Sequence, residues 1–522
     1  MSLKFLFLLT LISLSANYGY CYKILGVFAF PGISHNILTS KLMRGLLEAG
    51  HDVTMVATIP LKDVPPKGGK YNEILLDGIV QNFEALSTNK NMFDMTKDNL
   101  LLMLVNMAEH FKTFNTLTFT DPKVQQLIHS GEKFDAVVLE QFNNDGLKVF
   151  AHIFDCPLII LSSMGPNSWV NNLVGNPSPV SYASHFMVGD FSKDLSIYNR
   201  ASNLFAYISD YFISNFYLLP QQDAAIREHF PDAPPFGDLY TNVSLILLNS
   251  HISYYPALPV VPNMVEVGGY FIDPPKELPK DVKDILDNSP EGVIYFSMGS
   301  NLKSKDLPLE KREFILRVLG KLKEKVLWKF EEDLPDRPKN VLIRKWLPQQ
   351  DILAHPNIKL FITHGGLLST TETIYHGVPI LAIPVFGDQN ANADRAVAGG
   401  YGLKLEYLSS DFTEENLEKK LNELLHNPQY RNNVKSKQKL FHDRPEKPMK
   451  TAVYWVEYAI RHKGAPHLRV AGAKLPWYKY YMVDVLAVIL LALLVVYKTG
   501  KCVVQKLFGK IKQTVSSEKK KN

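Results

Sequence analysis

The sequence predicts an α/β protein with two facing Rossmann-like domains, each built on a doubly wound parallel sheet, followed by one C-terminal transmembrane helix. Three observations support this fold class. Short β-rich segments alternate with helical patterns in two separate series, a Pro- and Gly-rich stretch divides the two series, and a long apolar run stands near the C-terminus. A chain of 522 residues is also too long for one ordinary core.

The N-terminus is typical of a secretory signal peptide, which we place at residues 1–21. A lysine precedes the apolar run of residues 5–14, and the small Gly19 permits cleavage near Tyr22. A first core strand or helix is the alternative interpretation. Cleavage would leave the strand of residues 23–30 to begin the folded protein.

The first alternating series predicts an N-terminal domain over residues 22–262. Its opening order of strand, loop, helix and strand is the first unit of a doubly wound parallel sheet. The predicted elements are the strands 22–30, 52–58, 134–140 and 157–163, and the amphipathic helix 37–49.

The stretch 263–288 is rich in Pro and Gly, as a linker would be. A second alternating series follows and predicts a C-terminal domain over residues 289–440. Two such domains form a cleft, with ligands expected at the C-terminal ends of the strands. The predicted elements are the helix 309–323 and the strands 292–300, 325–330, 341–346, 358–364 and 379–385.

The run "YYMVDVLAVILLALLVVY", residues 480–497, predicts a single transmembrane helix, with a buried core helix as the alternative. It would span about 27 Å at ~1.5 Å per residue. Aromatic residues precede it and lysines follow it, so the positive-inside rule places the tail 498–522 in the cytosol and the body in the lumen. The ending Lys-Lys-Lys-Asn resembles the dilysine retrieval signal of endoplasmic reticulum membrane proteins. These features predict a single-pass type I protein of that membrane.

Charge and cysteine usage add little further. The net charge of +5 depends on eight lysines in the C-terminal tail, so we expect no nucleic acid partner. Cys156 would be alone in the lumen, which leaves no intramolecular disulfide there. Asn242 begins the sequon Asn-Val-Ser, but the residues that follow look like a buried strand, so its glycosylation stays open.

The segment "FITHGGLLSTTETIYHGVPILAIPVFGDQ", residues 361–389, has the pattern of an anion site. A strand gives way to His364, Gly365 and Gly366, and a helical pattern follows. Backbone N–H groups at a helix N-terminus attract a phosphate, and the missing side chains let it approach closely. A tight turn without a ligand is the alternative.

Residues on both sides of this segment extend the pattern. Trp346 at a strand end offers a flat face for a base, and Gln349 offers amide hydrogen bonds. Glu372 can accept hydrogen bonds from ribose hydroxyls, and Asp388 and Gln389 follow another strand end where polar groups could hold a sugar. Contacts for a base, a ribose, a diphosphate and a sugar therefore occur in one continuous segment.

Residues 346–389 resemble the signature of the UDP-glycosyltransferase family, and the resemblance extends over essentially the whole chain. The chain is most similar to the membrane-bound animal enzymes, in particular the insect-type branch. The resemblance implies a GT-B fold with the acceptor in the N-terminal domain and the UDP-sugar mainly in the C-terminal domain. It also implies that the segment 441–479 crosses back onto the first domain.

The resemblance also implies roles for individual residues. Those matched to the UDP-sugar are Trp346 and Gln349 for uracil, Glu372 for ribose, Ser300, His364, Gly365 and Gly366 for the diphosphate, and Asp388 and Gln389 for the transferred sugar.

The resemblance places the catalytic base at His35, in the loop after the first strand. The acceptor hydroxyl must lose its proton as it attacks the anomeric carbon, and a neutral imidazole oriented by a carboxylate suits that task. We expect Asp145 to be that carboxylate, with Glu140 as its rival. Helix capping is the alternative role for Asp145, and capping or plain solvent exposure for His35.

The expected reaction is an inverting displacement without a metal or cofactor, because the sequence shows no carboxylate cluster suited to a metal; the UDP-sugar is a co-substrate. Vertebrate glucuronosyl-type relatives carry an arginine where this sequence has Asn249, which favours glucose over glucuronate. Leu368 replaces a common asparagine near the phosphate, which leaves phosphate contacts more dependent on the backbone.

The expected acceptor is a small lipophilic molecule with a hydroxyl group. The aromatic-rich segment 201–220 fits a lipophilic ligand wall, a membrane-surface contact or an ordinary core helix. A glucuronosyltransferase, a non-catalytic UDP-sugar-binding relative, a GT-B-like epimerase and a lipid-modifying transferase stay open as alternatives, and so does a homo-oligomer.

Overall fold

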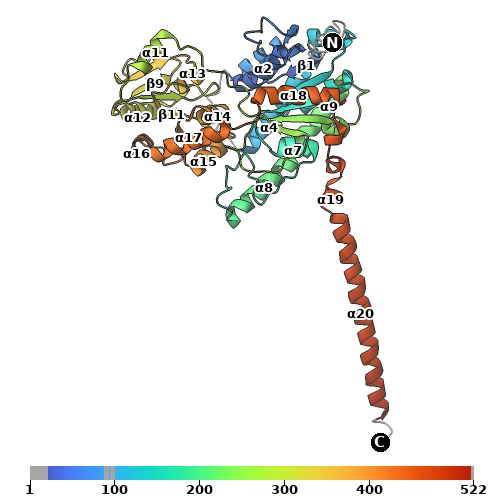
Figure 1. The fold of residues 1–522 in the computed structure, drawn as a ribbon. Coiled ribbons are helices and arrows are strands. Elements are labelled where there is room, and N and C mark those ends of the chain that lie inside the picture. Colours follow the sequence, from blue (N-terminus) through green and yellow to red (C-terminus); the bar gives the residue numbers. More distant parts are fainter. Residues whose placement is uncertain (1–20, 88–92, 94–99, 519–522) are drawn as a thin grey trace, which may run out of the picture. The chain divides into compact units, whose positions relative to one another are not determined.

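The computed structural model describes residues 21–87, 93 and 100–518. These residues form two units, one ending at Arg469 and one beginning at Val470. The first unit contains two parallel β-sheets (Figure 1). Residues 1–20 of the expected signal peptide and the last four residues, with the expected retrieval signal, lie outside the described residues.

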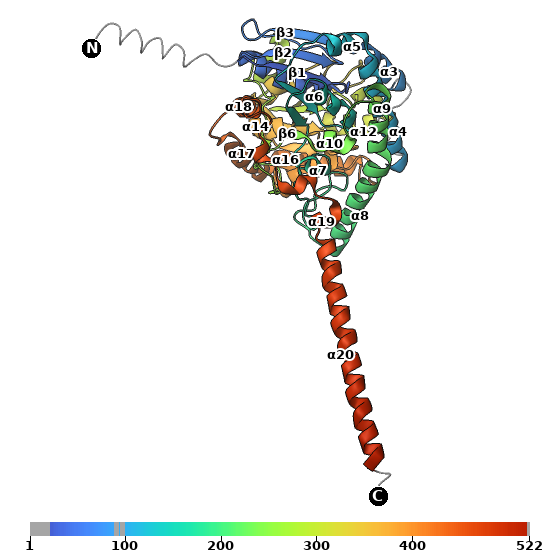
Figure 2. The ribbon, with the colours of Figure 1, turned by 90° about the vertical axis from the view of Figure 1, so that its right-hand side faces the viewer.

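The first sheet has the strand order β3-β2-β1-β4-β5-β6-β7, and its pairings are parallel. Figure 2 shows β1, β2 and β3 side by side at one edge. The strands are β1 (Lys23–Phe28), β2 (Asp52–Ala57), β3 (Tyr71–Leu75), β4 (Ala136–Glu140), β5 (Leu158–Ser162), β6 (Val243–Leu248) and β7 (Met264–Glu266).

Helices cover this sheet. Alternate side chains of each strand enter cores on opposite faces, as Leu25 and Val27 on one face and Ile24 and Phe28 on the other illustrate. The helices are α2 (Ile33–Glu48), α3 (Asp77–Ser87), α4 (Leu100–Thr120), α5 (Pro122–His129), η2 (Asp145–Lys148), α6 (Val149–Ile153), α7 (Ser168–Val174), α8 (Ile197–Ile213), η3 (Ser214–Leu218), α9 (Leu219–His229) and α10 (Phe236–Thr241).

The second sheet has the order β10-β9-β8-β11-β12-β13, which numbered within the domain is the doubly wound order 3-2-1-4-5-6. Its strands are β8 (Val293–Ser297), β9 (Lys325–Lys329), β10 (Val341–Arg344), β11 (Ile358–Thr363), β12 (Ile380–Ala382) and β13 (Gly402–Lys404). Its helices are α11 (Lys280–Asp287), η4 (Ser304–Asp306), α12 (Leu309–Gly320), α13 (Gln349–Leu353), α14 (Leu367–His376), α15 (Gln389–Ala398), α16 (Glu414–His426) and α17 (Pro428–His442).

In both sheets the strand order reverses direction at the centre, between β1 and β4 in the first and between β8 and β11 in the second. Ligands of open α/β sheets bind outside the carboxyl ends of the strands at such switch points. The fold therefore directs attention to the residues that follow these four strands.

The linker expected over residues 263–288 is too wide. Met264–Glu266 forms the edge strand β7, which pairs with β6, and Phe271 belongs to the core of the first sheet. Lys280–Asp287 forms α11, whose Val282 and Leu286 pack in a core of the second sheet. Proline and glycine mark the chain crossing correctly, but short elements occupy both of its ends.

The chain returns to the first sheet after α17. Helix α18 (Pro448–Arg461) contributes Ala452, Val456 and Ala459 to the core that α2 covers. Contact with α2 is close, because a Cβ atom at Gly45 would lie 2.1 Å from the sulfur of Met449. In Figure 1 α18, coloured orange, accordingly lies with the blue and green elements of the first domain. A short turn, η5 (Pro466–Leu468), then ends the first unit.

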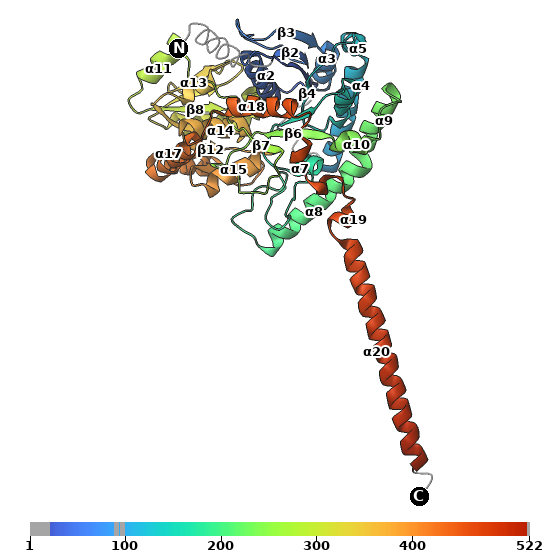
Figure 3. The same ribbon diagram turned by 45° about the vertical axis from the view of Figure 1, so that its right-hand side comes forward.

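Helix α8 and the following η3 carry the aromatic-rich segment (Figure 3). Asn203 is the buried residue of α8, whereas Tyr198, Phe205 and Phe216 are 76%, 73% and 70% exposed. The interpretation of this segment as an ordinary core helix is therefore wrong.

The second unit contains η6 (Ala471–Lys474), α19 (Trp477–Tyr480) and α20 (Val483–Glu518). Among the described residues, one helical segment, Val483–Lys510, is long and apolar enough to cross a membrane. It begins later than the expected residue 480, because Met482 adopts a left-handed conformation with φ of 55° and separates α19 from α20.

Candidate active site

His35 and Glu140 meet at the switch point of the first sheet. His35 lies in the first turn of α2, which begins at Ile33, four residues before the expected start of this helix. Glu140 ends β4, the strand beside β1. Nδ1 of His35 lies 2.5 Å from Oε1 of Glu140, and the Glu140 side chain is almost fully buried. The rings of Phe30 and Phe142 pack against the imidazole at centroid distances of 4.7 and 4.4 Å.

The expectation that Asp145 is the partner of His35 is wrong. Asp145 begins η2, and its carboxylate pairs with Nζ of Lys148 one helical turn later; both side chains are buried. Nε2 of Gln141 donates a further hydrogen bond of 2.9 Å to the same carboxylate oxygen. Because these groups already satisfy the Asp145 carboxylate, its rival Glu140 is the residue that holds the imidazole.

The loop after β11 has the geometry of an anion site. Gly365 adopts φ of +83°, a conformation that favours glycine, and Gly366 caps α14 in an extended conformation without a side-chain hydrogen bond. The backbone N–H groups of the first turn of α14 therefore have no side-chain acceptor at the cap, and the helix dipole adds partial positive charge there.

The ring of His364 is enclosed by backbone. A Cβ atom on Gly299 would lie 2.5 Å from Cε1 of His364, and one on Gly366 would lie 2.4 Å from Nε2. Burial, aided by the charge of Lys329, lowers the pKa of His364 to about 4. At neutral pH this imidazole is therefore an uncharged hydrogen-bonding group.

Ser300 and Lys329 lie at the carboxyl ends of the neighbouring strands β8 and β9. Ser300 follows Gly299 in the loop after β8 and is half-buried. Nζ of Lys329, at the end of β9, donates a hydrogen bond of 2.6 Å to the carbonyl of Gly299. Sequence reasoning did not select Lys329, although a lysine at the carboxyl end of an apolar strand was the signal that could have identified it.

Glu372, Gln349 and Gln350 form one cluster between α13 and α14. Nε2 of Gln349 donates to Oε2 of Glu372 at 2.6 Å, and Nε2 of Gln350 donates to Oε1 at 2.9 Å. Burial raises the pKa of Glu372 to about 7, against the lowering effect of these two amides. Sequence reasoning missed Gln350. Trp346, in the loop before α13, is 70% exposed, so a face of its indole is accessible.

Asp388 and Gln389 begin α15. Oε1 of Gln389 accepts hydrogen bonds from the N–H groups of Val385 and Phe386, so this oxygen holds the loop before the helix. Nδ2 of Asn392 donates to Oδ2 of Asp388 at 2.8 Å and to the carbonyl of Gly365 at 2.9 Å. Asn392 thereby connects the two loops that the sequence assigned to sugar and diphosphate.

The two domains also approach each other at this helix. Burial raises the pKa of Asp388, against the lowering effects of the hydrogen bond from Asn392 and of the nearby Arg395 and, most weakly, His35. Nε of Arg395 in α15 lies 3.0 Å from Oδ2 of Asp190, a residue of the first domain. The amide of Asp190 donates to Oδ2 of Asp394 at 3.1 Å. These contacts join α15 to the loop that precedes α8.

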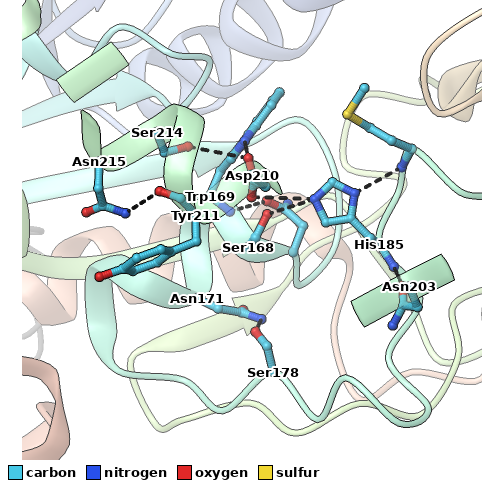
Figure 4. A network of polar contacts seen from close by, with 12 residues as sticks. Ser168, Trp169, Asn171, Ser178, His185, Asn203, Asp210, Tyr211, Ser214 and Asn215 are labelled. Carbon is cyan, nitrogen blue, oxygen red and sulfur yellow. Dashed lines mark hydrogen bonds and ion pairs between the residues drawn. The ribbon is translucent and has the colours of Figure 1, made fainter. Parts of the chain in front are cut away.

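A polar network supports aromatic residues on the first-domain side. In Figure 4 the carboxylate of Asp210 faces Nε1 of Trp169 and the ring of His185. Nε1 of Trp169 lies 3.4 Å from Oδ1, and Nε2 of His185 lies 3.4 Å from Oδ2. Trp169 in turn contacts Phe142, the ring that packs on His35. Asp210 thus orients an aromatic series that extends away from His35.

Comparison with known proteins identifies the family. The family model described as "UDP-glucoronosyl and UDP-glucosyl transferase" matches residues 27–521. The chain belongs to this family. As a UDP-glycosyltransferase it is an enzyme whose donor is a UDP-sugar.

Similar UDP-glycosyltransferases come from an insect and from mammals. UDP-glycosyltransferase UGT5 of Dactylopius coccus is 35% identical over 94% of this chain and 92% of that protein. UDP-glucosyltransferase 2 of the same species is 34% identical over 93% of both. UDP-glucuronosyltransferase 1A7 of Mus musculus is 34% identical over 77% of this chain and 76% of its own length. Both sugars therefore occur in the names of its relatives.

Solved structures confirm the GT-B fold. CalG4, the calicheamicin glycosyltransferase, aligns with a TM-score of 0.58 at 16% identity, covering 86% of this chain and all of CalG4. SnogD from Streptomyces nogalater aligns with a TM-score of 0.52 at 16% identity, covering 84% of this chain and all of SnogD.

The sequon of the UDP-glycosyltransferase lies at the start of β6. Asn242 is exposed, and its Oδ1 accepts a hydrogen bond of 2.8 Å from Arg469. Ser244 is buried, and its hydroxyl accepts a hydrogen bond of 3.2 Å from the same guanidinium. Glycosylation of Asn242 stays a prediction.

Proposed function

We propose that this UDP-glycosyltransferase transfers glucose from UDP-glucose to a hydroxyl group of a small lipophilic acceptor, with inversion at the anomeric carbon. The contact between His35 and Glu140 is the observation that carries the proposal. It provides an oriented imidazole at the switch point of the first sheet, where ligands of open α/β sheets bind.

In the proposed mechanism, Nδ1–H of His35 donates to the Glu140 carboxylate, which leaves the lone pair of Nε2 to accept a proton. The acceptor hydroxyl transfers its proton to Nε2 as its oxygen bonds to C1 of the sugar. The bond from C1 to the UDP oxygen breaks, and UDP leaves with that electron pair. Glu140 stabilises the imidazolium that forms.

The leaving diphosphate would bind at the N-terminus of α14. There the backbone N–H groups after Gly365 and Gly366 meet the developing negative charge, as preorganised donors do in other transferases. His364 would donate a hydrogen bond rather than supply a charge, since burial keeps its pKa low. Ser300 and Lys329 lie beside the same loop.

The nucleoside would bind through residues of α13 and α14. The exposed indole of Trp346 fits stacking on uracil, and Gln349 lies where it can reach both uracil and Glu372. Glu372 would accept hydrogen bonds from the ribose hydroxyls, and Asp388 with Gln389 would hold the hexose. Because the amide oxygen of Gln389 already serves the loop, its NH₂ group is the part suited to the sugar.

Glucose is the proposed sugar for two reasons. One relative that matches nearly the whole chain is named a UDP-glucosyltransferase. Glucuronosyl-type relatives carry an arginine at the position that corresponds to Asn249 of this chain. Asn249 follows β6, is fully buried, and donates a hydrogen bond to the carbonyl of Ser163. A neutral amide there cannot form an ion pair with a glucuronate carboxylate. Glucuronate stays the alternative, because other relatives are named for it.

A lipophilic acceptor is supported by the aromatic series Phe30, Phe142, Trp169 and Phe186, whose members contact one another in succession beside His35. Aromatic side chains provide large apolar contact areas for such molecules. We further propose that α20 anchors the enzyme in the endoplasmic reticulum membrane with the body in the lumen.

The test is a donor competition. Full-length enzyme in microsomes, opened so that donors reach the lumen, receives labelled UDP-glucose or UDP-glucuronate with a panel of phenols and other lipophilic alcohols. Mass spectrometry should identify β-glucosides, formed faster than any glucuronide. Faster glucuronide formation would overturn the choice of sugar. Binding of UDP without product from any donor would favour the non-catalytic alternative.

A further inference from the structure

The turn after β4, residues 141–148, carries much of the environment of His35. Glu140, immediately before this β4 turn, holds Nδ1 of the imidazole, and Phe142 within the turn packs against the ring. The position of the turn therefore decides where two groups around the imidazole lie. Its composition is unusual, because the turn is largely buried and yet contains two charged side chains, which are rarely buried in proteins.

A buried ion pair closes the β4 turn from inside. The side chains of Lys148 and Asp145 are 1% and 6% exposed, and the Lys148 ammonium contacts Oδ1 of Asp145. The same ammonium donates 2.7 Å to Oε1 of Gln141, whose Nε2 donates 2.9 Å to that Oδ1. The three side chains form a closed triangle. Gln141 is the residue next to Glu140, so the triangle directly restrains the end of β4.

Two other helices restrain the opposite side of the turn. Gln222 of α9 donates 3.2 Å to the carbonyl of Asn143, which has a left-handed φ of 54°. Oε1 of Gln222 accepts a hydrogen bond of 3.0 Å from the backbone N–H of Gly146 and another from the side-chain NH₂ group of Asn115 in α4. The β4 turn is thus connected through polar side chains to both helices.

Stability alone does not explain a charge pair in this place. Transfer of Lys148 and Asp145 out of water is costly, and apolar side chains of similar volume often serve a core equally well or better. An ion pair differs from apolar side chains in that its hydrogen bonds require a defined geometry, so it favours one conformation of the turn. In this turn that arrangement places Glu140 and Phe142 against His35.

We propose that Lys148 and Asp145 are positioning residues for the reaction: their buried pair fixes the β4 turn so that Glu140 holds His35 in the orientation that accepts the acceptor proton. The proposal rests on the proposed function, in which His35 is the base. It gives Asp145 an indirect role, which reaches the imidazole through Gln141 and its neighbour Glu140.

The first experiment replaces the pair by apolar side chains. The full-length double variant Asp145→Leu/Lys148→Met leaves no unpaired buried charge, although the buried amide of Gln141 loses both of its partners. It should therefore fold with a somewhat lower unfolding midpoint, and kcat is compared well below that midpoint. We expect kcat to fall by about tenfold, while KM for the UDP-sugar and Kd for UDP change by less than about twofold. An unchanged kcat would overturn the proposal, and so would an equal loss of UDP binding.

The second experiment asks whether the pair acts through Glu140, by a double-mutant cycle. We expect Glu140→Gln alone to lower kcat by about a hundredfold. If the pair only positions Glu140, adding the double variant should cost at most about twofold more. Multiplication of the two losses, to roughly a thousandfold, would show that the pair acts independently and would overturn the proposal.

A second polar pair of the same domain, with one buried and one partly exposed member, serves as the control. Nε2 of the buried His51 lies 3.1 Å from Oε1 of Glu457. The control variant His51→Leu/Glu457→Gln should change kcat by less than about twofold. When it is combined with Glu140→Gln, the effects of the two changes on kcat should multiply, as expected for independent sites. If Glu140→Gln and His35→Ala both leave kcat unchanged, the proposed mechanism itself fails, and the positioning role fails with it. If Glu140→Gln and His35→Ala both lower kcat, but the kcat losses of Glu140→Gln and of the Asp145/Lys148 double variant multiply, only the positioning role fails.

Discussion

Nδ1 of His35 and Oε1 of Glu140 lie 2.5 Å apart, although 105 positions separate the two residues in the sequence. They meet because β1 and β4 are neighbours in the first sheet: Glu140 ends β4, and His35 lies in the first turn of the helix that follows β1. This contact orients the imidazole. Substitutions in the first domain should therefore affect catalysis, whereas substitutions at the UDP site in the second domain should affect donor binding.

Replacement of His35 by alanine should abolish transfer and leave donor binding intact. A base of this kind contributes up to about 10⁴-fold, so we expect kcat to fall by at least about a thousandfold. UDP should bind with unchanged affinity in a calorimetric titration, because the groups assigned to UDP belong to the second domain. His129→Ala, at an exposed histidine of α5, is the matched control. Full transfer by His35→Ala would refute the mechanism.

Replacement of Gly366 by alanine should weaken UDP binding. The new methyl group would lie 2.4 Å from Nε2 of His364, so the buried ring must move and the anion site with it. We expect Kd for UDP to rise by roughly tenfold or more, since small displacements of binding groups have effects of that order.

The control for this variant is Gly237→Ala, also at a helix, where a Cβ atom meets nothing within 4 Å. It should leave UDP affinity unchanged. Normal UDP affinity in Gly366→Ala would show that the His364 ring does not contribute to the diphosphate site.

The fold could be predicted where periodicity is strong and long. The strands at 23–28 and 293–297 and the doubly wound order follow from apolar runs that alternate with helical patterns. The edge strands β3 and β7 were missed, because Tyr71–Leu75 contains polar residues and Met264–Glu266 is short. Such strands acquire their identity from the neighbour with which they pair, and that neighbour is distant in sequence.

Part of the site could be predicted for a similar reason. His364, Gly365 and Glu372 lie on one strand–turn–helix unit, so their spacing alone places them together. The choice between Asp145 and Glu140 depends on which carboxylate a buried lysine already neutralises, and that is a property of the packed turn. Gln350 was missed for the same reason, because only its tertiary contact with Glu372 distinguishes it from a surface residue.

Glu372 and His364 should give the protein opposing dependences of stability on pH. Burial raises the pKa of Glu372 to about 7, so its contribution to stability is full below about pH 4.5 and is lost as the pH rises towards 7. The pKa of His364 is lowered to about 4, so its contribution is full above about pH 6.5 and is lost as the pH falls towards 4. A shift of about 2.5 units corresponds to roughly 3 kcal/mol in each case, and the two slopes partly cancel.

Replacement of Glu372 by glutamine should therefore remove one of the two opposing pH dependences of the free energy of unfolding and leave that of His364. Relative to wild type, the variant should gain roughly 3 kcal/mol in free energy of unfolding between pH 4.5 and 7, as followed by denaturant titration of the detergent-solubilised enzyme. The substituted amide keeps the volume of the side chain, so packing changes little, and any constant offset cancels in the difference between the two pH values. A difference that stays flat over this range would mean that Glu372 is ionised well below neutral pH in the folded enzyme.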